Sequence, residues 1–258
     1  MAVAHSIKKQ RPADTAQISE AERQVRRDLA AAYRLAYRHG WDDLIYTHIS
    51  ARVPGTHDAF LVNAFGLCFE EITASNLVKI DIDGTIIGES EYPVNAAGFV
   101  IHGAIHKAVP EIMCVMHLHT QAGIAVSAME DGLLPLSQHA MRFHGRIGYH
   151  EFEGIALSAD EEKRLVGDLG RHRVMILRNH GLLTCGETVA EAFVYMYYLE
   201  MACKIQIAAM AAQRLHLPTP KIPDLTASQF AEDADPPGSR EWPAMLRRLD
   251  RECPEYRN

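Results

Sequence analysis

A short hairpin signal near residue 80 limits the folds that this chain can adopt. Residues 77–82 and 85–87 are strand-like, and the dipeptide Asp83-Gly84 between them favours a tight turn. Strands joined by so short a turn run antiparallel. We therefore expect a sheet that is at least partly antiparallel.

Helix-like and strand-like segments alternate irregularly around this hairpin. Ser19 with Glu22, and Thr188 with Glu191, are capping-box pairs that begin helices, expected to end near residues 40 and 215. Further helices are expected at residues 96–107, 121–129 and 159–169, and strands at 46–53, 60–63, 112–119 and 174–178. This alternation favours a sheet covered by helices on both faces.

The two ends of the chain differ from its middle. Residues 1–18 are polar and aperiodic, so we expect a flexible N-terminal arm. Residues 217–258 are rich in prolines and acids and are expected to form a C-terminal tail with little core of its own, although Trp242 could dock on the domain. Residues 19–216 would then form one domain, since single cores rarely grow beyond about 250–300 residues.

Composition excludes several classes of partner. The 258 residues are 48% hydrophobic and carry a formal net charge of −7, which is ordinary for a globular protein and lacks the basic footprint of a nucleic-acid binder. No apolar run approaches the roughly 20 residues that span a bilayer. Residues 1–10 lack the apolar segment of a signal peptide. We expect no nucleic-acid or membrane partner, and a cytoplasmic location.

The five cysteines do not indicate a thiol-based site. They are odd in number, widely scattered and include no CxxC pair. Neither a disulfide framework nor a thiolate zinc site is therefore expected.

Two histidines, His117 and His119, lie on the strand expected at residues 112–119. Alternate side chains of a strand project from the same face, so the two imidazoles lie about 6.5–7 Å apart along the strand and can reach one ion. Such a pair suits zinc, whose bonds to nitrogen are about 2.0–2.1 Å long. Two partly buried histidines with hydrogen-bonded rings would explain the pair equally well. His180, at the end of another expected strand, could supply a third imidazole.

The chain resembles the class II aldolase and adducin family over about residues 23–212, and it looks most like the bacterial adducin-head-like branch. The resemblance includes His117-Leu118-His119-Thr120 before an alanine-rich helix, and Arg178-Asn179-His180-Gly181 some sixty residues later. Further matching motifs are Gly40-Trp41, residues 44–53 (LIYTHISARV), 65–67 (FGL), 72–75 (ITAS), 94–99 (VNAAGF) and 132–137 (GLLPLS).

The resemblance implies an α/β fold, a three-layer αβα sandwich with a central, mainly antiparallel sheet. It also implies a homotetramer with C4 symmetry, a small-molecule substrate and sites near subunit interfaces. One divalent metal ion per subunit would be held by His117, His119 and His180. Zn²⁺ is the expected ion, with Fe²⁺ or Mn²⁺ as alternatives.

Several positions depart from the sugar-phosphate aldolases of this family. In those enzymes a metal polarises the oxygens of an enediolate, while a glutamate moves the proton. With His102 at the family's helix histidine, the carboxylate position falls on Gly98, and two phosphate-binding serines fall on Ala96 and Ala97. A glycine-asparagine pair is matched by Thr47-His48. A substrate without phosphate is therefore expected.

Candidate catalytic and substrate-binding residues lie outside the three histidines. The family counterpart of residues 137–150 supplies acid or substrate contacts, sometimes to a neighbouring subunit, so His139 or His144 could replace the missing base. A solvent-exposed polar loop would also explain these histidines. The catalytic candidates are His139, His144 and Tyr149, and the substrate-binding candidates are His48, Ser50, Asn63 and Gly66.

One further pair, His102 and His106, has i, i+4 spacing on the helix expected at residues 96–107. Such a pair can bind a metal in principle. A role behind the ligands or at the surface is favoured here.

Three functions remain open from the sequence. A metal-dependent lyase would cleave an aldol bond or release carbon dioxide from a non-phosphorylated hydroxy or keto acid, bound at the open positions of the metal. Iron or manganese in the same site would allow oxygenase chemistry. An adducin-like assembly module would keep the fold without the chemistry. The lyase is favoured, since three convergent imidazoles serve little packing purpose without an ion.

Overall fold

A mixed sheet organises the part of the chain that the structure describes. The computed structural model describes residues 6–7, 10–11, 18–154, 159–212 and 214–258. The strands, in chain order, are β1 (Ser6–Ile7), β2 (Gln10–Arg11), β3 (His48–Arg52), β4 (Ala59–Val62), β5 (Val78–Asp81), β6 (Ile86–Ile87), β7 (Val94–Asn95), β8 (Cys114–Leu118), β9 (Ile147–His150), β10 (Val174–Leu177) and β11 (Gly181–Gly186). The main sheet has the order β2-β6-β5-β4-β3-β8-β11-β10-β9, and β1 pairs separately with β7.

Most pairs in this sheet run antiparallel. Within the described ranges, β2–β6 and β9–β10 are the parallel pairs. The expected hairpin is β5–β6, in which Ile80 pairs with Ile86. The mainly antiparallel sheet is therefore confirmed.

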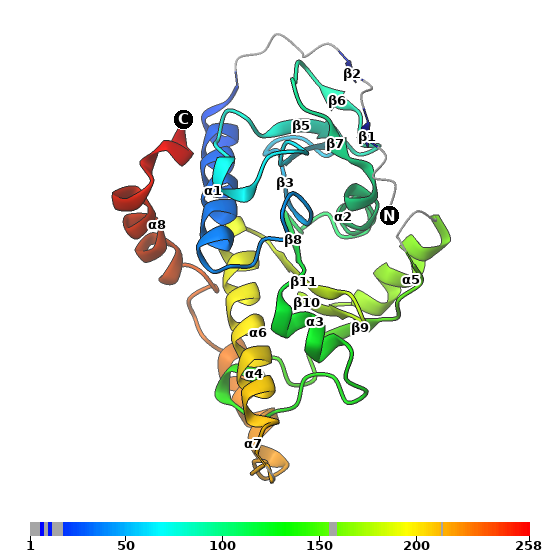
Figure 1. Ribbon diagram of the computed structural model, residues 1–258, viewed down its shortest axis with the longest axis vertical. Helices are drawn as coiled ribbons and strands as arrows, with labels where there is room; N and C mark the ends of the chain where they lie inside the picture. The colour runs from blue at the N-terminus through cyan, green and yellow to red at the C-terminus, as the bar shows by residue number, and fades with distance from the viewer. Residues whose placement is uncertain (1–5, 8–9, 12–17, 155–158, 213) are drawn as a thin grey trace.

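Helices cover both faces of the sheet (Figure 1). They are α1 (Glu20–Arg38), α2 (Ala96–Ala108), α3 (Gln121–Ser127), α4 (Gln138–Met141), α5 (Ala159–Leu169), α6 (Val189–Ala209), α7 (Lys221–Ala231) and α8 (Glu241–Glu252). Residues of α1, α3 and α6 share one buried cluster with the sheet, and residues of α2 and α5 share another. The three-layer αβα sandwich is confirmed.

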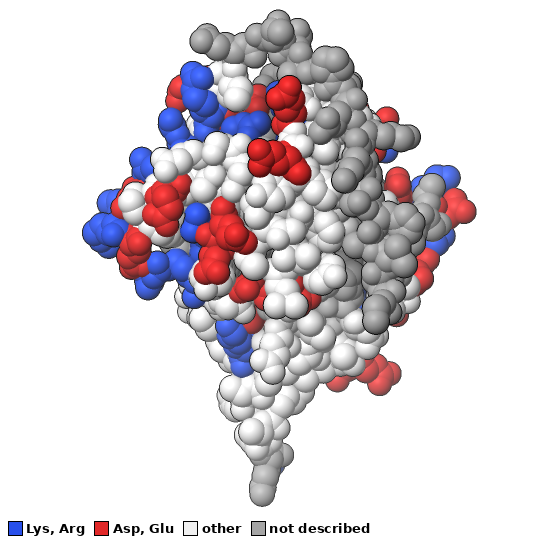
Figure 2. All heavy atoms as spheres, turned by 45° about the horizontal axis from the view of Figure 1, so that its top comes forward, with Lys and Arg blue, Asp and Glu red and all other residues white. Residues whose placement is uncertain are grey.

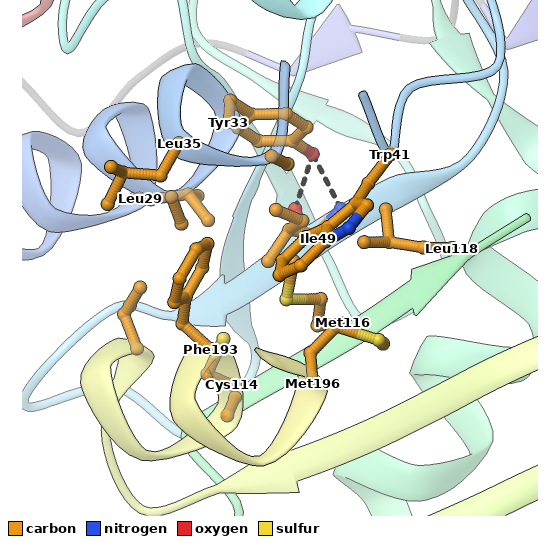
Figure 3. Close-up of a cluster of buried hydrophobic side chains, with 14 of the residues drawn as sticks. Leu29, Tyr33, Leu35, Trp41, Ile49, Cys114, Met116, Leu118, Phe193 and Met196 are labelled. Carbon is orange, nitrogen blue, oxygen red and sulfur yellow. Dashed lines mark hydrogen bonds between the residues drawn. The ribbon is translucent and has the colours of Figure 1, made fainter. Parts of the chain in front are cut away.

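The alternation of side chains along β8 divides these two cores. Cys114, Met116 and Leu118 face the α1 and α6 layer, where they share one buried cluster with Phe193 and Trp41 (Figure 3). Val115 faces the opposite layer, among residues of α2 and α5. By the same alternation His117 points toward the α2 layer. The pattern that builds the core thus also orients the histidine.

The central strand β11 was not expected from the sequence. Its apolar run is short and bounded by Gly181 and Gly186, so it carries little periodic signal. All six of its residues are buried, and it pairs with β8 on one side and β10 on the other. Its place is therefore determined by its neighbours in the sheet.

Both terminal segments contact the rest of the fold where they are described. The strand Ser6–Ile7 pairs with β7, and Gln10–Arg11 pairs with β6; the other residues of the N-terminal arm before residue 18 lie outside the described ranges. The expected C-terminal tail contains α7 and α8. Trp242 of α8 is 6% exposed, and its indole Nε1 donates to Asp28 of α1 at 2.9 Å. The proposed domain boundaries remain a prediction.

Charged side chains of both signs lie on the molecular surface. On the face shown in Figure 2, acidic and basic side chains border a central region of other residues. Among the described helices, none is both long and apolar enough to cross a membrane.

One buried hydroxyl ties α1 to the sheet. Tyr33 is fully buried, and its Oη accepts a hydrogen bond from Ile49 N at 2.6 Å (Figure 3). The same oxygen lies 2.7 Å from Ile49 O and 2.9 Å from Asn63 Oδ1, either of which can accept its proton. The contact fixes the start of β3 against the helix.

Replacing Tyr33 with phenylalanine should lower the free energy of unfolding by about 1–3 kcal/mol, because a buried N–H loses its acceptor. Urea denaturation of the Tyr33→Phe variant would measure this loss. Tyr92→Phe is the matched control, since Tyr92 lies at the surface. Equal stability of the two variants would contradict the role assigned to the Tyr33 hydroxyl.

Candidate metal centre

Three histidines converge where two neighbouring strands meet. His117 lies on β8, His119 follows that strand, and His180 immediately precedes β11. Because β8 pairs antiparallel with β11, the end of one strand lies beside the start of the other. One nitrogen from each ring lies within 4.8 Å of the other two. The structure therefore brings together the three residues predicted as metal ligands.

A tight turn places His180 beside the other two rings. Asn179 has a φ of 55°, in the left-handed region that asparagine tolerates better than most residues. The backbone N–H of His180 donates to Leu177 O at 3.1 Å and closes the turn. Gly181 follows, where an added Cβ would lie 2.6 Å from Leu118 O. Glycine thus allows the close approach of β11 to β8 beside the site.

Hydrogen bonds hold the rings of His117 and His119 from behind. Nδ1 of His117 lies 3.0 Å from Leu182 O, and Nδ1 of His119 lies 2.9 Å from the Asp43 carboxylate. A carbonyl and an ionised carboxylate can only accept, so each Nδ1 donates its proton. Each Nε2 then carries a lone pair, and these two nitrogens face each other at 3.1 Å.

This arrangement fits a bound divalent ion. Two lone pairs at 3.1 Å repel each other unless a cation or a proton lies between them. Two nitrogens bound to zinc at about 2.0–2.1 Å in a tetrahedral site lie roughly 3.3 Å apart. A hydrogen bond to the remote ring nitrogen is also the usual way in which proteins orient a metal-bound imidazole. The donor set and its spacing therefore suit a metal.

Burial favours the neutral form that a metal requires. It lowers the pKa of His117 well below the usual 6.5, and the neighbouring His180 and His119 lower it further. Burial and the nearby His119 lower the pKa of His180 to about 4. Metal binding requires unprotonated imidazole, so at neutral pH these two rings have no proton to lose before binding a metal.

A chain of hydrogen bonds begins beside these ligands and continues beneath α2. Its successive contacts are His48 Nδ1 to His102 Nε2 at 2.8 Å, His102 Nδ1 to Ser50 Oγ at 2.7 Å, Ser50 Oγ to His106 Nε2 at 2.9 Å, and His106 Nδ1 to Ile112 O at 3.2 Å. All three histidines are almost completely buried. A surface position for His102 and His106 is therefore excluded.

The last acceptor determines the direction of the whole chain. Ile112 O can only accept, so His106 Nδ1 donates to it, and His106 Nε2 accepts from the Ser50 hydroxyl. That hydroxyl oxygen then accepts from His102 Nδ1, and His102 Nε2 accepts from His48 Nδ1. Nε2 of His48 is left with a lone pair. No other contact within the described ranges satisfies this atom.

The three imidazole rings in this row of hydrogen bonds are neutral at physiological pH. Burial, with a smaller effect of His119 and His180, lowers the pKa of His48 to about 3. Burial and the nearby Arg52 lower that of His106 to about 3. His48 therefore presents an uncharged acceptor rather than a cation.

A small cavity lies beside His48. It has a volume of about 10 Å³ and is lined by His48, Val62, Asn63, Val94, Asn95, Phe99 and His102. This is room for about one water molecule. Asn95 Oδ1 is buried and has no hydrogen-bond partner among the described residues. The structure thus places two substrate-binding candidates, His48 and Asn63, around one small cavity.

The residue before His48 is strained. Thr47 has a φ of 65°, which is rare for a β-branched side chain. Its hydroxyl is buried and lacks a hydrogen-bond partner among the described residues. Strain and unsatisfied polar atoms concentrate at functional sites in proteins. Both features therefore support a functional role for this part of the chain.

A second small cavity lies beside His180. It is also about 10 Å³ and is lined by His150, Glu161, Arg178 and His180 among others. His150 Nδ1 contacts Asp168 at 2.7 Å, whereas its buried Nε2 has no hydrogen-bond partner in the described part of the chain.

The three catalytic candidates lie apart from the ligands within one subunit. His139 packs against Tyr198 of α6, with ring centroids 5.5 Å apart, and His144 lies 3.7 Å from Asp224 of α7. Tyr149 accepts a hydrogen bond from Leu133 N. No contact among the described residues joins these side chains to the triad, so their catalytic role remains a prediction.

Gly66 and the first turn of α2 are the remaining regions that the sequence linked to the substrate. Gly66 lies in a turn with a φ of 111°, and an added Cβ would meet nothing within 4 Å. Ala96, Ala97 and Gly98 form the first turn of α2, but their side-chain surroundings lie outside the described part of the structure. The absence of a carboxylate there follows from the sequence alone.

Sequence reasoning missed two residues of the site. Asp43 orients His119 but lies 76 positions before it, in a loop with no motif of its own. Asn95 was noted only within the family motif, although its position just before α2 is typical of a capping residue. Its side chain makes no cap hydrogen bond.

Protonation of the buried histidines should make stability depend on pH. Because folding lowers the pKa of His106 from 6.5 to about 3, only the unfolded chain binds this proton between those values. The free energy of unfolding should therefore fall as the pH drops below about 6.5, by up to about 1.4 kcal/mol per pH unit for each such histidine.

Urea denaturation of chelator-treated protein between pH 7.5 and 5 would measure this slope. The His106→Gln variant should have a shallower slope than the unmodified chain. His216→Gln, at an exposed position, is the matched control and should keep the full slope. Identical slopes in all three proteins would show that His106 does not resist protonation.

Comparison with known proteins agrees with the observed fold. The family described as Class II Aldolase and Adducin N-terminal domain matches residues 27–207. An aldolase II superfamily protein from Pseudomonas syringae is 52% identical, with a TM-score of 0.91 over 94% of this chain and 98% of that one. L-fuculose 1-phosphate aldolase from Glaciozyma antarctica is 30% identical, with a TM-score of 0.83 over 96% and 97% of the two chains.

Adducins also match, over a smaller share of their length. Rat alpha-adducin is 44% identical over 205 residues, which cover 78% of this chain and 28% of that protein. The similarity therefore extends both to an aldolase and to a part of a longer adducin chain. From the family match across most of its length, the chain belongs to the class II aldolase and adducin family.

Proposed function

We propose that this protein is a metal-dependent lyase that cleaves, by aldol cleavage or decarboxylation, a non-phosphorylated hydroxy or keto acid. The observation that carries the proposal is the triad of His117, His119 and His180, in which two lone pairs face each other at 3.1 Å. The aldolase relatives support a lyase-type reaction.

The three histidines would hold one divalent ion, which we propose to be Zn²⁺, with Fe²⁺ or Mn²⁺ as alternatives. When bound, such an ion would supply Lewis-acid polarisation of a substrate carbonyl or carboxylate. Asp43 and the Leu182 carbonyl would hold two of the ligands in position. His48 would accept a hydrogen bond from a substrate hydroxyl, because its free Nε2 is neutral and carries a lone pair.

The expected loss of the phosphate-binding side chains supports this substrate class. Gly98 stands where the aldolases have their carboxylate, and Ala96 and Ala97 replace two hydroxyl side chains. The cavity beside His48 is lined by neutral groups and contains no lysine or arginine side chain among its described lining. A phosphate would find neither hydroxyl donors nor a cation there.

Metal analysis is the most direct test of the triad. Protein purified without added metal should contain about one divalent ion per chain, measured by elemental mass spectrometry, and the ion should be lost from the His117→Ala variant. His216→Ala removes an exposed histidine and should retain the metal. A metal-free chain, or equal metal content in both variants, would rule out the proposed site.

Activity would then test the reaction class. The protein should release carbon dioxide or an aldehyde from one or more members of a panel of hydroxy and keto acids. Chelation should abolish that release, and Zn²⁺ should restore it. Activity that survives chelation would contradict the lyase mechanism, whereas iron content with oxygen uptake would support the oxygenase alternative.

We further propose that the substrate site is completed between subunits of a homotetramer. The cavities beside His48 and His180 each hold about one water molecule, too little for an organic acid. His139, His144 and Tyr149 lie elsewhere in the same chain. In an oligomer such residues could reach the ligands of a neighbouring subunit.

Mixing of inactive variants tests this arrangement. His117→Ala and His139→Ala homomers should each lose most of the activity, whereas mixed oligomers refolded together should regain part of it, because some sites then combine intact residues from two chains. No recovery in the mixture, while the separate oligomers remain intact by light scattering, would place the complete site in one chain.

A second candidate is an assembly module without chemistry, which the identity to alpha-adducin supports. It predicts a stable oligomer without bound metal. The metal content of the untreated protein separates the two proposals.

A further inference from the structure

A cationic cavity lies away from the three histidines. It has a volume of about 440 Å³ and lies among α4, α6, the end of α7 and the turn before β10 (Figure 1). Its lining includes four arginines, Arg142, Arg146, Arg171 and Arg173, together with His172, and its apolar and aromatic lining includes Phe143, Val174, Tyr195, Phe230 and Pro237. None of these residues belongs to the candidate metal centre.

Arg142 is a partly buried cation that forms no ion pair among the described residues. Its guanidinium is sandwiched between two rings, 4.0 Å from the centroid of Tyr198 and 4.1 Å from that of Phe230. Its Nε is buried without a hydrogen-bond partner in the described part of the structure. Leaving a guanidinium partly desolvated and unpaired is costly, and arginine remains charged at all physiological pH values.

The nearest acids are engaged elsewhere. Asp233 and Glu241 act on Arg142 only through space. Asp233 lies 3.6 Å from Arg240, and Glu241 accepts a hydrogen bond from Gly238 N. Neither acid forms an ion pair with Arg142 among the described contacts.

Two of the remaining arginines are also available to a ligand. Arg146 and Arg171 are exposed at the rim and form no ion pair within the described ranges. Arg173 differs, because it pairs with Glu187 at 2.9 Å. Three unpaired guanidinium groups therefore meet at one cavity, in a chain whose net charge is −7.

The chemistry of this lining specifies a class of ligand. Guanidinium groups recognise phosphate oxygens through paired hydrogen bonds, and several together favour an anion with more than one charge. Tyr195, which is partly exposed, offers aromatic surface to a flat ring, whereas Phe143 is buried and Phe230 stacks on Arg142. The volume lies within the roughly 300–1,000 Å³ usual for small-molecule sites. We propose that this cavity binds a nucleoside phosphate, independently of the metal centre.

Calorimetric titration of the full chain with ADP, without magnesium and at low salt, tests the proposal. ADP should bind saturably, and both Arg142→Gln and Arg171→Gln should weaken binding at least about tenfold. Arg247→Gln makes the same charge change on α8, at an exposed position outside the lining, and should leave the affinity unchanged. His117→Ala should also bind normally, which separates this site from the metal.

Three results would overturn the proposal. They are the absence of saturable ADP binding, an unchanged affinity in Arg171→Gln, and adenosine binding as tightly as ADP. Arg171 is exposed, so its substitution tests the site even if Arg142→Gln fails to fold. Affinity that falls with added sodium chloride, together with weak adenosine binding, would support recognition of the phosphates.

Discussion

The pairing of β3 with β8 is the constraint on which the candidate site depends. In this register His48 lies opposite His117, and Ser50 lies opposite Val115. Side chains alternate along both strands, so a slip of one residue would turn His48 and Ser50 into the α1 layer and separate them from His102. The register is held from the other face by Ile49 and Met116, which pack in the core around Tyr33. The register between β3 and β8 thus determines both the core packing and the geometry of the site.

Local signals in the sequence predicted the parts of this structure that local interactions determine. The cap at Ser19, the hairpin at Asp83-Gly84 and the shared face of His117 and His119 each depend on residues close together in the chain, and the structure contains all three. The strand β11 and the helices α7 and α8 were missed because their burial comes from distant neighbours. The position of His180 at the end of an expected strand made it a candidate third ligand, and resemblance to the family then assigned it to the ligand set.

The same distinction applies to the hydrogen bonds around the ligands. The contact between His119 and Asp43 joins residues 76 positions apart, and that between Ser50 and His106 spans 56. The sequence positions of these residues do not predict such contacts. The sequence could show that a carboxylate is missing at Gly98, whereas only the fold shows that the polar groups beside the ligands are neutral imidazoles.

The hydrogen-bonded chain from His48 ends at the backbone carbonyl of Ile112, and this end point limits proton transfer along the chain. A relay can conduct protons only if both of its ends exchange them with a base, an acid or water. A peptide carbonyl is too weak a base to take up a proton at physiological pH, so this row of imidazoles is a dead end. It can fix the tautomer of His48, but it cannot carry protons away from the site. Under the proposed function, a proton released at the ligands must therefore leave by a route other than this row of imidazoles.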